Sequence, residues 1–267
     1  MIDSHVHFWN PNDLDYDWLE ATSPLYRAFL PTDYEPGREA CGVSGAVFVQ
    51  ASHDPRENAW AFELADRFEW LLGVVGWVDL EAEDVRITLE HLSQHRRFKG
   101  VRHLVHNEAD ERWLLRPKVG AGLEALGELG LSFDLILRPE QFQYAPGVVA
   151  AHPELLFVLD HLGSPTGETL RDWARTLERL AGHANVTAKI SGLPRNIARH
   201  AISIALETFG SNRLMLGGDY PICTLELLYA TALTTMLEAL RGLAPNGLHS
   251  ITTAKAAHVY RLSSDRA

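Results

Sequence analysis

Short apolar runs rich in β-branched residues recur along the whole chain and alternate with longer stretches of helical periodicity. Such alternation is typical of repeated βα units, in which each strand is followed by a helix that packs against the sheet. Eight runs of this kind predict a closed (β/α)8 TIM barrel, which usually needs about 250 residues. The predicted strands span residues 2–8, 46–51, 73–79, 99–105, 132–138, 156–161, 186–191 and 214–219.

The stretches between these strands place apolar residues three and four positions apart. This spacing predicts helices over residues 55–68, 82–95, 113–129, 168–181, 197–209 and 225–240. An open, doubly wound sheet is the alternative arrangement, but no Gly-x-Gly-x-x-Gly turn follows the first strand. No low-complexity linker interrupts the chain, so we expect residues 1–267 to form a single domain of the α/β class.

The segment 10–36 is longer than most connections in compact domains and carries Trp18 among several aromatic residues. Because binding residues are often found on loops, we interpret this segment as a long loop over the mouth of the barrel. The alternative is a surface loop whose aromatic side chains pack onto the first helix.

Composition excludes several classes of partner. The formal net charge of −11 and the lack of a basic stripe argue against nucleic acid. The two cysteines, Cys41 and Cys223, form no Cys-x-x-Cys motif, which indicates a reducing compartment. Without a basic leader or an apolar run of about 18 residues, we expect a cytoplasmic protein with no membrane partner. A homo-oligomer is compatible with this composition.

The first predicted strand carries Asp3, His5 and His7 at alternate positions, which share one face of a regular strand. Two residues advance about 6.6 Å along a strand, a gap that two imidazoles can close around one ion at about 2.0–2.1 Å per bond. The His-x-His pair is therefore a candidate for metal binding, and a chance pair of histidines is the alternative.

Polar residues end nearly every predicted strand, and the active sites of TIM barrels lie at the carboxyl ends of the strands. Because buried charges cost several kcal/mol unless they are paired, this pattern predicts a solvated pocket with a polar ligand. The residues are His5, His7, Gln50, Asp79, Arg102, His103, Asp134, Arg138, Asp160, His161, Lys189, Ser191 and Asp219.

The segments DSHVHFWNP, GVRHLVHNEADERWLLRP, FDLILRP, FVLDHLGSP, KISGL and LGGDYP resemble the amidohydrolase superfamily. Within it they are similar to the amidohydrolase-related branch of metal-independent and single-metal lactonases and decarboxylases. The likeness is greatest to the sugar-lactone hydrolases, of which L-fuconolactonase and L-rhamnonolactonase are typical. It covers nearly the whole chain and almost every strand end.

The resemblance implies that His5, His7, His161 and Asp219 meet at the barrel mouth and hold one divalent ion, with zinc the first choice. Three imidazoles and a carboxylate suit a single Zn²⁺ that keeps a position open for water. The two-metal pattern of the superfamily is not expected, because the fourth strand carries Arg102 and His103 where that pattern needs a lysine. Metal-independent chemistry, in which the same residues hold substrate by hydrogen bonds, is the alternative.

The resemblance also implies a hydrolase that opens a small-molecule sugar-acid lactone by water attack at the ester carbonyl. Asp219 would be the general base, a role that contributes about 10²–10⁴-fold in rate. Arg102 or His103 would stabilise the oxyanion, and since strand alternation lets one of them face the pocket, we favour His103 for substrate contact. The expected substrate-binding residues are Gln50, Asp79, Asp134, Trp18 and Trp113.

Other functions are consistent with the same residues. A nonoxidative decarboxylase or a pyrone-dicarboxylate lactonase would use Arg102 and Arg138 to clamp a substrate carboxylate. A catalytically inactive sugar-binding barrel is the alternative that is not an enzyme. For Asp219 itself, the alternative to a general base is a structural acid in a turn.

Overall fold

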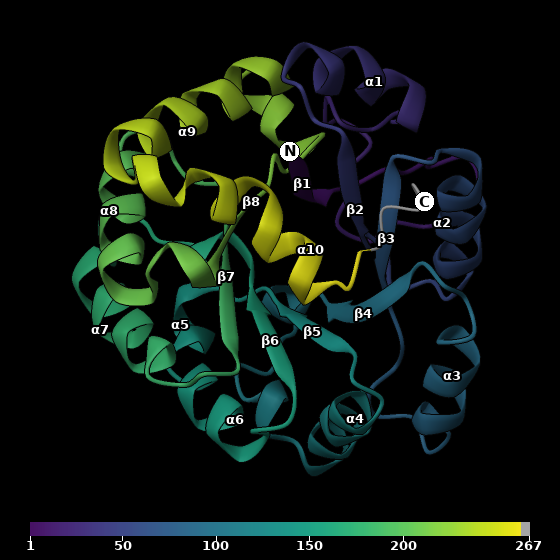
Figure 1. Ribbon diagram of the computed structural model, residues 1–267. Coiled ribbons are helices and arrows are strands. Elements are labelled where there is room, and N and C mark those ends of the chain that lie inside the picture. The colour runs from purple at the N-terminus through teal and green to yellow at the C-terminus, as the bar shows by residue number, and fades with distance from the viewer. Residues whose placement is uncertain (263–267) are drawn as a thin grey trace.

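The computed structural model describes residues 1–262, which contain eight parallel strands in the order β1 to β8, each hydrogen-bonded to the next. Helices surround the strands (Figure 1), so the predicted (β/α)8 barrel is confirmed. The strands are Ile2–Val6 (β1), Gly45–Val49 (β2), Leu71–Gly76 (β3), Phe98–His103 (β4), Ser132–Leu135 (β5), Leu156–Leu159 (β6), Val186–Ile190 (β7) and Leu214–Leu216 (β8). The helices are Pro31–Ala40 (α1), Arg56–Arg67 (α2), Val85–Leu92 (α3), Pro117–Glu128 (α4), Pro139–Phe142 (α5), Ala145–Ala151 (α6), Leu170–Ala181 (α7), Ala198–Phe209 (α8), Tyr229–Leu243 (α9) and Lys255–Val259 (α10).

The barrel closes between its first and last strands through backbone hydrogen bonds. The amide of His7 donates to the carbonyl of Tyr220 across 2.6 Å, and the amide of Asp219 donates to the carbonyl of His5 across 2.9 Å. The Ser4 hydroxyl adds a bond of 2.8 Å to the carbonyl of Leu216. Closure therefore brings the first strand and the last strand together at His5, His7 and Asp219, which the sequence analysis proposes for the site.

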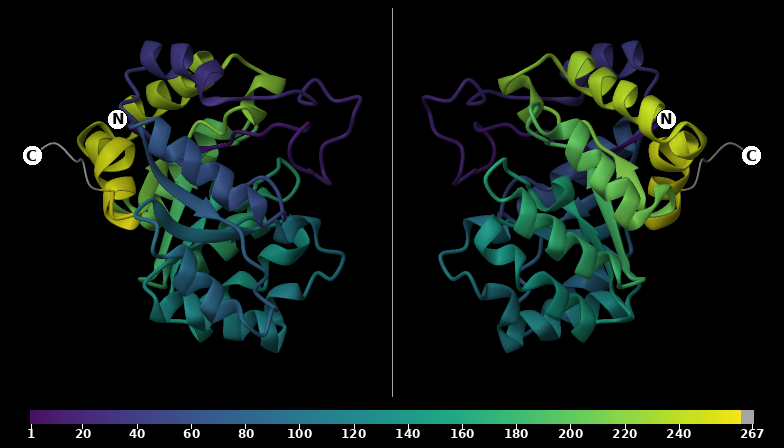
Figure 2. Two further views of the ribbon diagram at one scale, coloured as in Figure 1. Left: turned by 90° about the vertical axis from the view of Figure 1, so that its right-hand side faces the viewer. Right: turned by 90° about the vertical axis from the view of Figure 1, so that its left-hand side faces the viewer.

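Apolar side chains fill the amino-terminal part of the barrel interior and seal that end. Val47, Val49, Val75, Val158 and Met215 form an inner cluster, and the C-terminal segment adds Ala256, Val259 and Tyr260 to it. Helix α10 lies across this end of the barrel (Figure 1), on the side away from the long loop that follows β1 (Figure 2). A ligand therefore approaches from the carboxyl ends of the strands.

Several strands are shorter than predicted because side chains pair with the backbone at their ends. The predicted strand 73–79 ends at Gly76, where the amide of Trp77 donates to Asn58 Oδ1 (3.0 Å) and Asn58 Nδ2 donates to the carbonyl of Trp77 (2.7 Å). Asn58 lies on α2, and its side-chain amide takes the backbone hydrogen bonds that a neighbouring strand would otherwise make to Trp77. Asp79 consequently leaves the sheet and is exposed.

The expected loop 10–36 is shorter than predicted because helix α1 begins at Pro31. Proline suits the first position of a helix, and the Asp33 carboxylate accepts the amide proton of Leu30 at 2.8 Å. Trp9 and Phe29 exchange two backbone hydrogen bonds, of 3.0 and 2.8 Å, at the base of the remaining loop. This loop projects at the carboxyl ends of the strands (Figure 2). Within residues 1–262, none of the helices combines the length and the apolarity that crossing a bilayer requires.

Candidate active site

A cavity of about 170 Å³ opens at the carboxyl ends of the strands. Its polar lining comes from His7, Arg102, His106, His161 and Asp219. Its apolar lining comes from Trp9, Trp18, Ala51, Leu104, Ile136 and Ile222. An apolar cavity with a few polar groups that point into it is the usual form of a small-molecule site.

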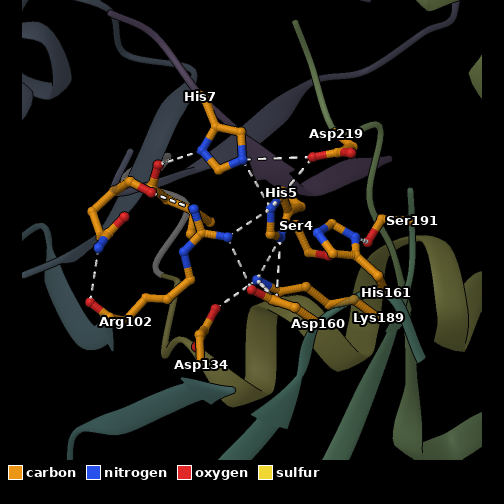
Figure 3. Close-up of polar contacts among 12 residues, drawn as sticks. Ser4, His5, His7, Arg102, Asp134, Asp160, His161, Lys189, Ser191 and Asp219 are labelled. Atoms are coloured by element: carbon orange, nitrogen blue, oxygen red, sulfur yellow. Dashed lines mark hydrogen bonds and ion pairs between the residues drawn. The ribbon is translucent and has the colours of Figure 1, made fainter. Parts of the chain in front are cut away.

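The side chains of His5, His7 and Asp219 bring three possible ligand atoms close to one another (Figure 3). His7 Nδ1 lies 2.7 Å from the carbonyl of Val49, which can only accept, so His7 carries its proton on Nδ1 and a lone pair on Nε2. His5 Nε2 lies 3.1 Å from His7 Nε2. Asp219 Oδ1 lies 3.6 Å from His5 Nε2 and 3.5 Å from His7 Nε2.

His161 approaches the same point from the end of β6. It has a positive φ of 54°, and its Nδ1 lies 2.9 Å from the hydroxyl of Ser191. Gly192 leaves the room that this ring needs, because a Cβ on that residue would lie 2.6 Å from His161 Nδ1. Ligand atoms of His5, His161 and Asp219 all lie within 4.8 Å of one another, the separation expected of a metal-binding group.

The donor atoms fit a single zinc-sized ion. Zinc bonds of about 2.0–2.1 Å in a tetrahedral arrangement separate neighbouring ligand atoms by about 3.3–3.4 Å. The separations of 3.1, 3.5 and 3.6 Å among His5, His7 and Asp219 bracket that value. His161 is the fourth candidate ligand, at a longer separation. Imidazole nitrogen and carboxylate oxygen are donors that zinc accepts readily.

A fully buried ionic network lies beneath His5 (Figure 3). Lys189 Nζ lies 2.5 Å from Asp134 Oδ2, 3.0 Å from Asp160 Oδ1 and 3.1 Å from His5 Nδ1. Arg102 Nη1 lies 3.2 Å from Asp160 Oδ2. Burial alone would raise the pKa of Asp160, but Lys189, His5 and Arg102 hold it well below its usual range. Two cations thus keep Asp160 ionised at 3.3 Å from His5 Nδ1, where it can orient that imidazole.

Asp3 does not share the face of His5 and His7, contrary to the expectation from strict alternation. The register of β1 shifts between Asp3 and Val6. Asp3 Oδ1 accepts the amides of His5 (3.0 Å) and Gly218 (2.8 Å), while its Oδ2 accepts the hydroxyls of Tyr34 (3.0 Å) and Tyr229 (2.7 Å). Asp3 therefore ties the backbone beside His5 to the backbone beside Asp219.

Asp219 is ionised at neutral pH. Burial alone would raise its pKa, but His161, His7 and His5 surround the carboxylate and lower the pKa to about 2. Its backbone has a φ of 55°, a left-handed conformation that Asp and Asn tolerate better than most residues. This turn after β8 directs the carboxylate into the cavity.

Arg102 and His103 take opposite sides of β4, as alternation requires, but the side chain that lines the cavity is Arg102. His103 stacks between His53 and Trp113, with ring centroids 4.3 and 4.1 Å away. This corrects our preference for His103 as the group that contacts substrate in the catalytic cavity.

Among the five expected substrate-binding residues, Trp18 lines the cavity and the others do not. Gln50 is buried and its Nε2 donates to the carbonyl of Arg102 at 3.1 Å. Asp134 pairs with Lys189 inside the barrel. The exposed carboxylate of Asp79 accepts the amide of Glu81 at 2.9 Å, and Trp113 packs against His103.

The catalytic, substrate-binding and metal-binding residues that we expected did not include His106, nor Asp160, which we noted only as a polar residue at a strand end. His106 lines the cavity, and its buried Nδ1 finds no hydrogen-bond partner among residues 1–262. Burial, together with the charges of Arg102 and His161, lowers the pKa of His106 to about 4, so the ring is neutral at pH 7. The sequence signal for His106 is its place just after β4, on the catalytic side.

A family model described as Amidohydrolase matches residues 2–262. The chain belongs to the amidohydrolase family. This amidohydrolase is 30% identical over 235 residues to an L-fucono-1,5-lactonase of Burkholderia ambifaria, a match that covers 84% of this chain and 81% of the relative. It is 32% identical over 252 residues to the L-fucono-1,5-lactonase of Burkholderia multivorans, covering 85% and 84% of the two chains.

A solved structure supports the same membership. The crystal structure of an amidohydrolase from Burkholderia multivorans with bound zinc superposes on this chain with a TM-score of 0.90 and 28% sequence identity. The superposition covers 98% of this amidohydrolase and 99% of that chain. The whole barrel, with its loops and its C-terminal helix, therefore has the architecture of that enzyme.

Proposed function

We propose that this amidohydrolase hydrolyses a sugar-acid lactone, of the L-fucono- or L-rhamnono-lactone type, to the aldonic acid. The observation that carries the proposal is the ionised Asp219 carboxylate at a cavity wall, 3.5 Å from His7 and 3.6 Å from His5. The names of the two Burkholderia relatives support the choice of substrate.

In the proposed reaction Asp219 accepts a proton from water while the water oxygen bonds to the ester carbonyl carbon. The carbonyl oxygen becomes an oxyanion beside Arg102, whose guanidinium lines the cavity. One such donor contributes about 3 kcal/mol to the transition state. The ring C–O bond then breaks, and Asp219 returns the proton to the departing alkoxide, which restores the carboxylate and releases the hydroxy acid.

We include a divalent metal, with zinc the first choice, in this proposal. His5, His7, His161 and Asp219 would hold it. A bound ion would polarise the ester carbonyl and lower the pKa of water. In the metal-independent alternative, the same imidazoles bind the substrate carbonyl and water by hydrogen bonds. Activity measured with and without a chelator separates these two cases.

The environment of the two arginines favours a neutral lactone over a carboxylated substrate. Arg138 donates to the backbone carbonyls of His106 (3.3 Å) and Glu108 (2.9 Å). Arg102 pairs with Asp160 and donates to the backbone carbonyl of Gln50. An oxyanion needs one N–H of Arg102, whereas the bidentate carboxylate clamp of a decarboxylase or a pyrone-dicarboxylate lactonase needs two and would have to displace these contacts.

A pH-indicator assay over a panel of aldonolactones tests the proposal. We expect acid release at a rate above spontaneous hydrolysis, saturable in at least one neutral aldonolactone. Carbon dioxide release from an aromatic or unsaturated acid would instead establish the decarboxylase. Saturable binding of sugars without turnover would establish the inactive sugar-binding barrel.

A further inference from the structure

A second cavity, of about 200 Å³, lies beside the catalytic one and shares Trp18, Ala51 and Leu104 with it. Its other lining residues are Asp17, Ser52, His53, Asn107 and Glu108. The proposed reaction uses none of these side chains. The second cavity therefore adjoins the catalytic one at these three shared residues.

A chain of hydrogen bonds fixes Glu108 at this second cavity. The indole N–H of Trp77 can only donate, and it lies 3.1 Å from His103 Nδ1. Neutral His103 therefore carries its proton on Nε2 and donates it to Glu108 Oε1 across 2.7 Å. The backbone of Glu108 is held as well, because its carbonyl accepts from Arg138 Nη2 at 2.9 Å. The role of His103 is thus to position Glu108.

The second cavity offers both donors and acceptors. Glu108 uses Oε1 for His103 and keeps Oε2 as an acceptor. His53 Nε2 accepts the amide of Leu104 at 3.1 Å, so neutral His53 can act at Nδ1 only as a donor. The indole N–H of Trp18 donates to the carbonyl of Ala51 at 2.6 Å, which holds the ring in the shared wall. Hydroxyl groups, which both donate and accept, match such a set.

The charged side chains that line the second cavity disfavour anions. They are the acids Asp17 and Glu108, and among the described residues that line it there is no lysine or arginine. A substrate carboxylate placed there would be repelled by these two acids, with no cation in the lining to compensate. A neutral hydroxyl group would not be repelled.

We propose that the second cavity is a hydroxyl-binding subsite for the part of the substrate remote from the ester. Glu108 is the acceptor that recognises those hydroxyls, and the cavity selects neutral polyhydroxylated lactones against carboxylated ones. This inference rests on the proposed lactonase function and adds the place where the hydroxyl groups of the substrate bind and the residue that recognises them.

Steady-state kinetics of Glu108→Ala tests the subsite with two substrates, a polyhydroxylated aldonolactone and an unsubstituted lactone of the same ring size. We expect KM for the hydroxylated lactone to rise about tenfold or more, since hydrogen bonds to a charged group are among the stronger ones, while its kcat changes less than about threefold. The unsubstituted lactone should be unaffected. Glu111→Ala, an exposed acid on the same loop, is the matched control.

An equal loss with both lactones, or no change with either, would overturn the subsite. Turnover of no lactone by the wild type would instead count against the proposed function. In that event calorimetric titration with the neutral sugar alcohol tests the subsite alone. Saturable binding that Glu108→Ala weakens about tenfold supports it, and binding that is absent or equal in the two proteins overturns it.

Discussion

Lys189 Nζ lies 3.0 Å from Asp160 Oδ1 in the centre of the barrel, where both side chains are fully buried. Lys189 also binds Asp134, whose Oδ2 accepts the hydroxyl of Tyr260 at 2.7 Å. The ammonium group of Lys189 and the carboxylate of Asp134 thus link Tyr260, in the C-terminal segment that seals one end of the barrel, to the imidazole of His5 near the other end. The same buried ion pairs therefore stabilise the fold and hold His5 in its position in the site.

The Lys189→Met variant should lose about 3–5 kcal/mol of unfolding free energy, because it leaves Asp134 and Asp160 as buried charges without their common partner. Urea denaturation followed by far-UV circular dichroism measures the loss. Lys118→Met, which replaces an exposed lysine, should change stability by less than about 0.5 kcal/mol. A Lys189→Met protein as stable as the wild type would show that the network contributes nothing to folding.

The His7→Ala variant should lower zinc affinity by more than about tenfold, since the fixed Nδ1 proton of His7 leaves Nε2 free to bind a cation. Metal content after dialysis against a defined zinc concentration gives the measurement. His200→Ala is the control, because His200 is an exposed residue of α8. Equal zinc content in the His7 variant and the wild type would remove His7 from the set of ligands.

The Asp219→Asn variant should lose about 10²–10⁴-fold in kcat with the fold intact. Asparagine tolerates the left-handed φ of 55° at this position and keeps the size of the side chain. The lactone assay gives the rate, and a thermal melt within a few degrees of the wild type confirms folding. Turnover within about tenfold of the wild type would exclude Asp219 as the general base.

The His106→Leu variant should raise KM for the hydroxylated lactone about tenfold, because the unpartnered Nδ1 of His106 is the polar atom that a substrate hydroxyl would meet on that wall. His106→Gln can restore a hydrogen bond, so it should recover much of the loss. If the two variants behave alike, with kcat and KM unchanged from the wild type, His106 does not contact the substrate.

Glu57 should make the protein less stable as the pH rises toward 8. Burial raises the pKa of this carboxyl to about 8, although it accepts the amides of Ala51 and Ser52. An unfolded chain ionises Glu57 near its ordinary pKa of 4.5. The stability that protonated Glu57 contributes is therefore fully present below pH 4.5. It is lost as the pH rises from there through about 8, and the unfolding free energy falls by up to about 1.4 kcal/mol per pH unit.

The Glu57→Gln variant should lose the part of the fall in unfolding free energy with rising pH that Glu57 causes. Urea denaturation at pH 5, 6.5 and 8 should show a smaller decline in unfolding free energy for Glu57→Gln than for the wild type. Glu63→Gln, at an exposed position of the same helix, should keep the decline of the wild type. Parallel curves for all three proteins would mean that Glu57 is ionised in the folded state.

Strand order placed many polar residues at one end of the barrel, and the resemblance to the amidohydrolase superfamily singled out His5, His7, His161 and Asp219 among them. In the structure the closed barrel brings the ends of β1 and β8, which carry His5 and Asp219, together. The choice between Arg102 and His103 could not be made in this way. Alternation says that they face opposite sides, but the side that faces the cavity depends on how β4 sits in the barrel.

Asp134, Asp79 and Trp113 show why polar or aromatic residues at strand ends are not all site residues. Asp134 Oδ2 lies 2.5 Å from Lys189 Nζ inside the barrel, so its charge is paired there and does not face the cavity. Asp79 lies beyond the point where Asn58 ends β3, three residues before the end of the predicted strand. Trp113 belongs to a stack around His103 that no periodicity in the sequence encodes.

The sequence by itself determined the barrel, since eight apolar runs that alternate with amphipathic stretches can bury their apolar faces in few other ways. The resemblance of its motifs to the amidohydrolase superfamily added the expectation that His5, His7, His161 and Asp219 meet at the barrel mouth. The tertiary structure alone decided which polar groups are paired and which are free. Pairing depends on distances between residues far apart in the chain, as from Lys189 to Asp134 and from His103 to Glu108, and local sequence patterns carry no information about such distances.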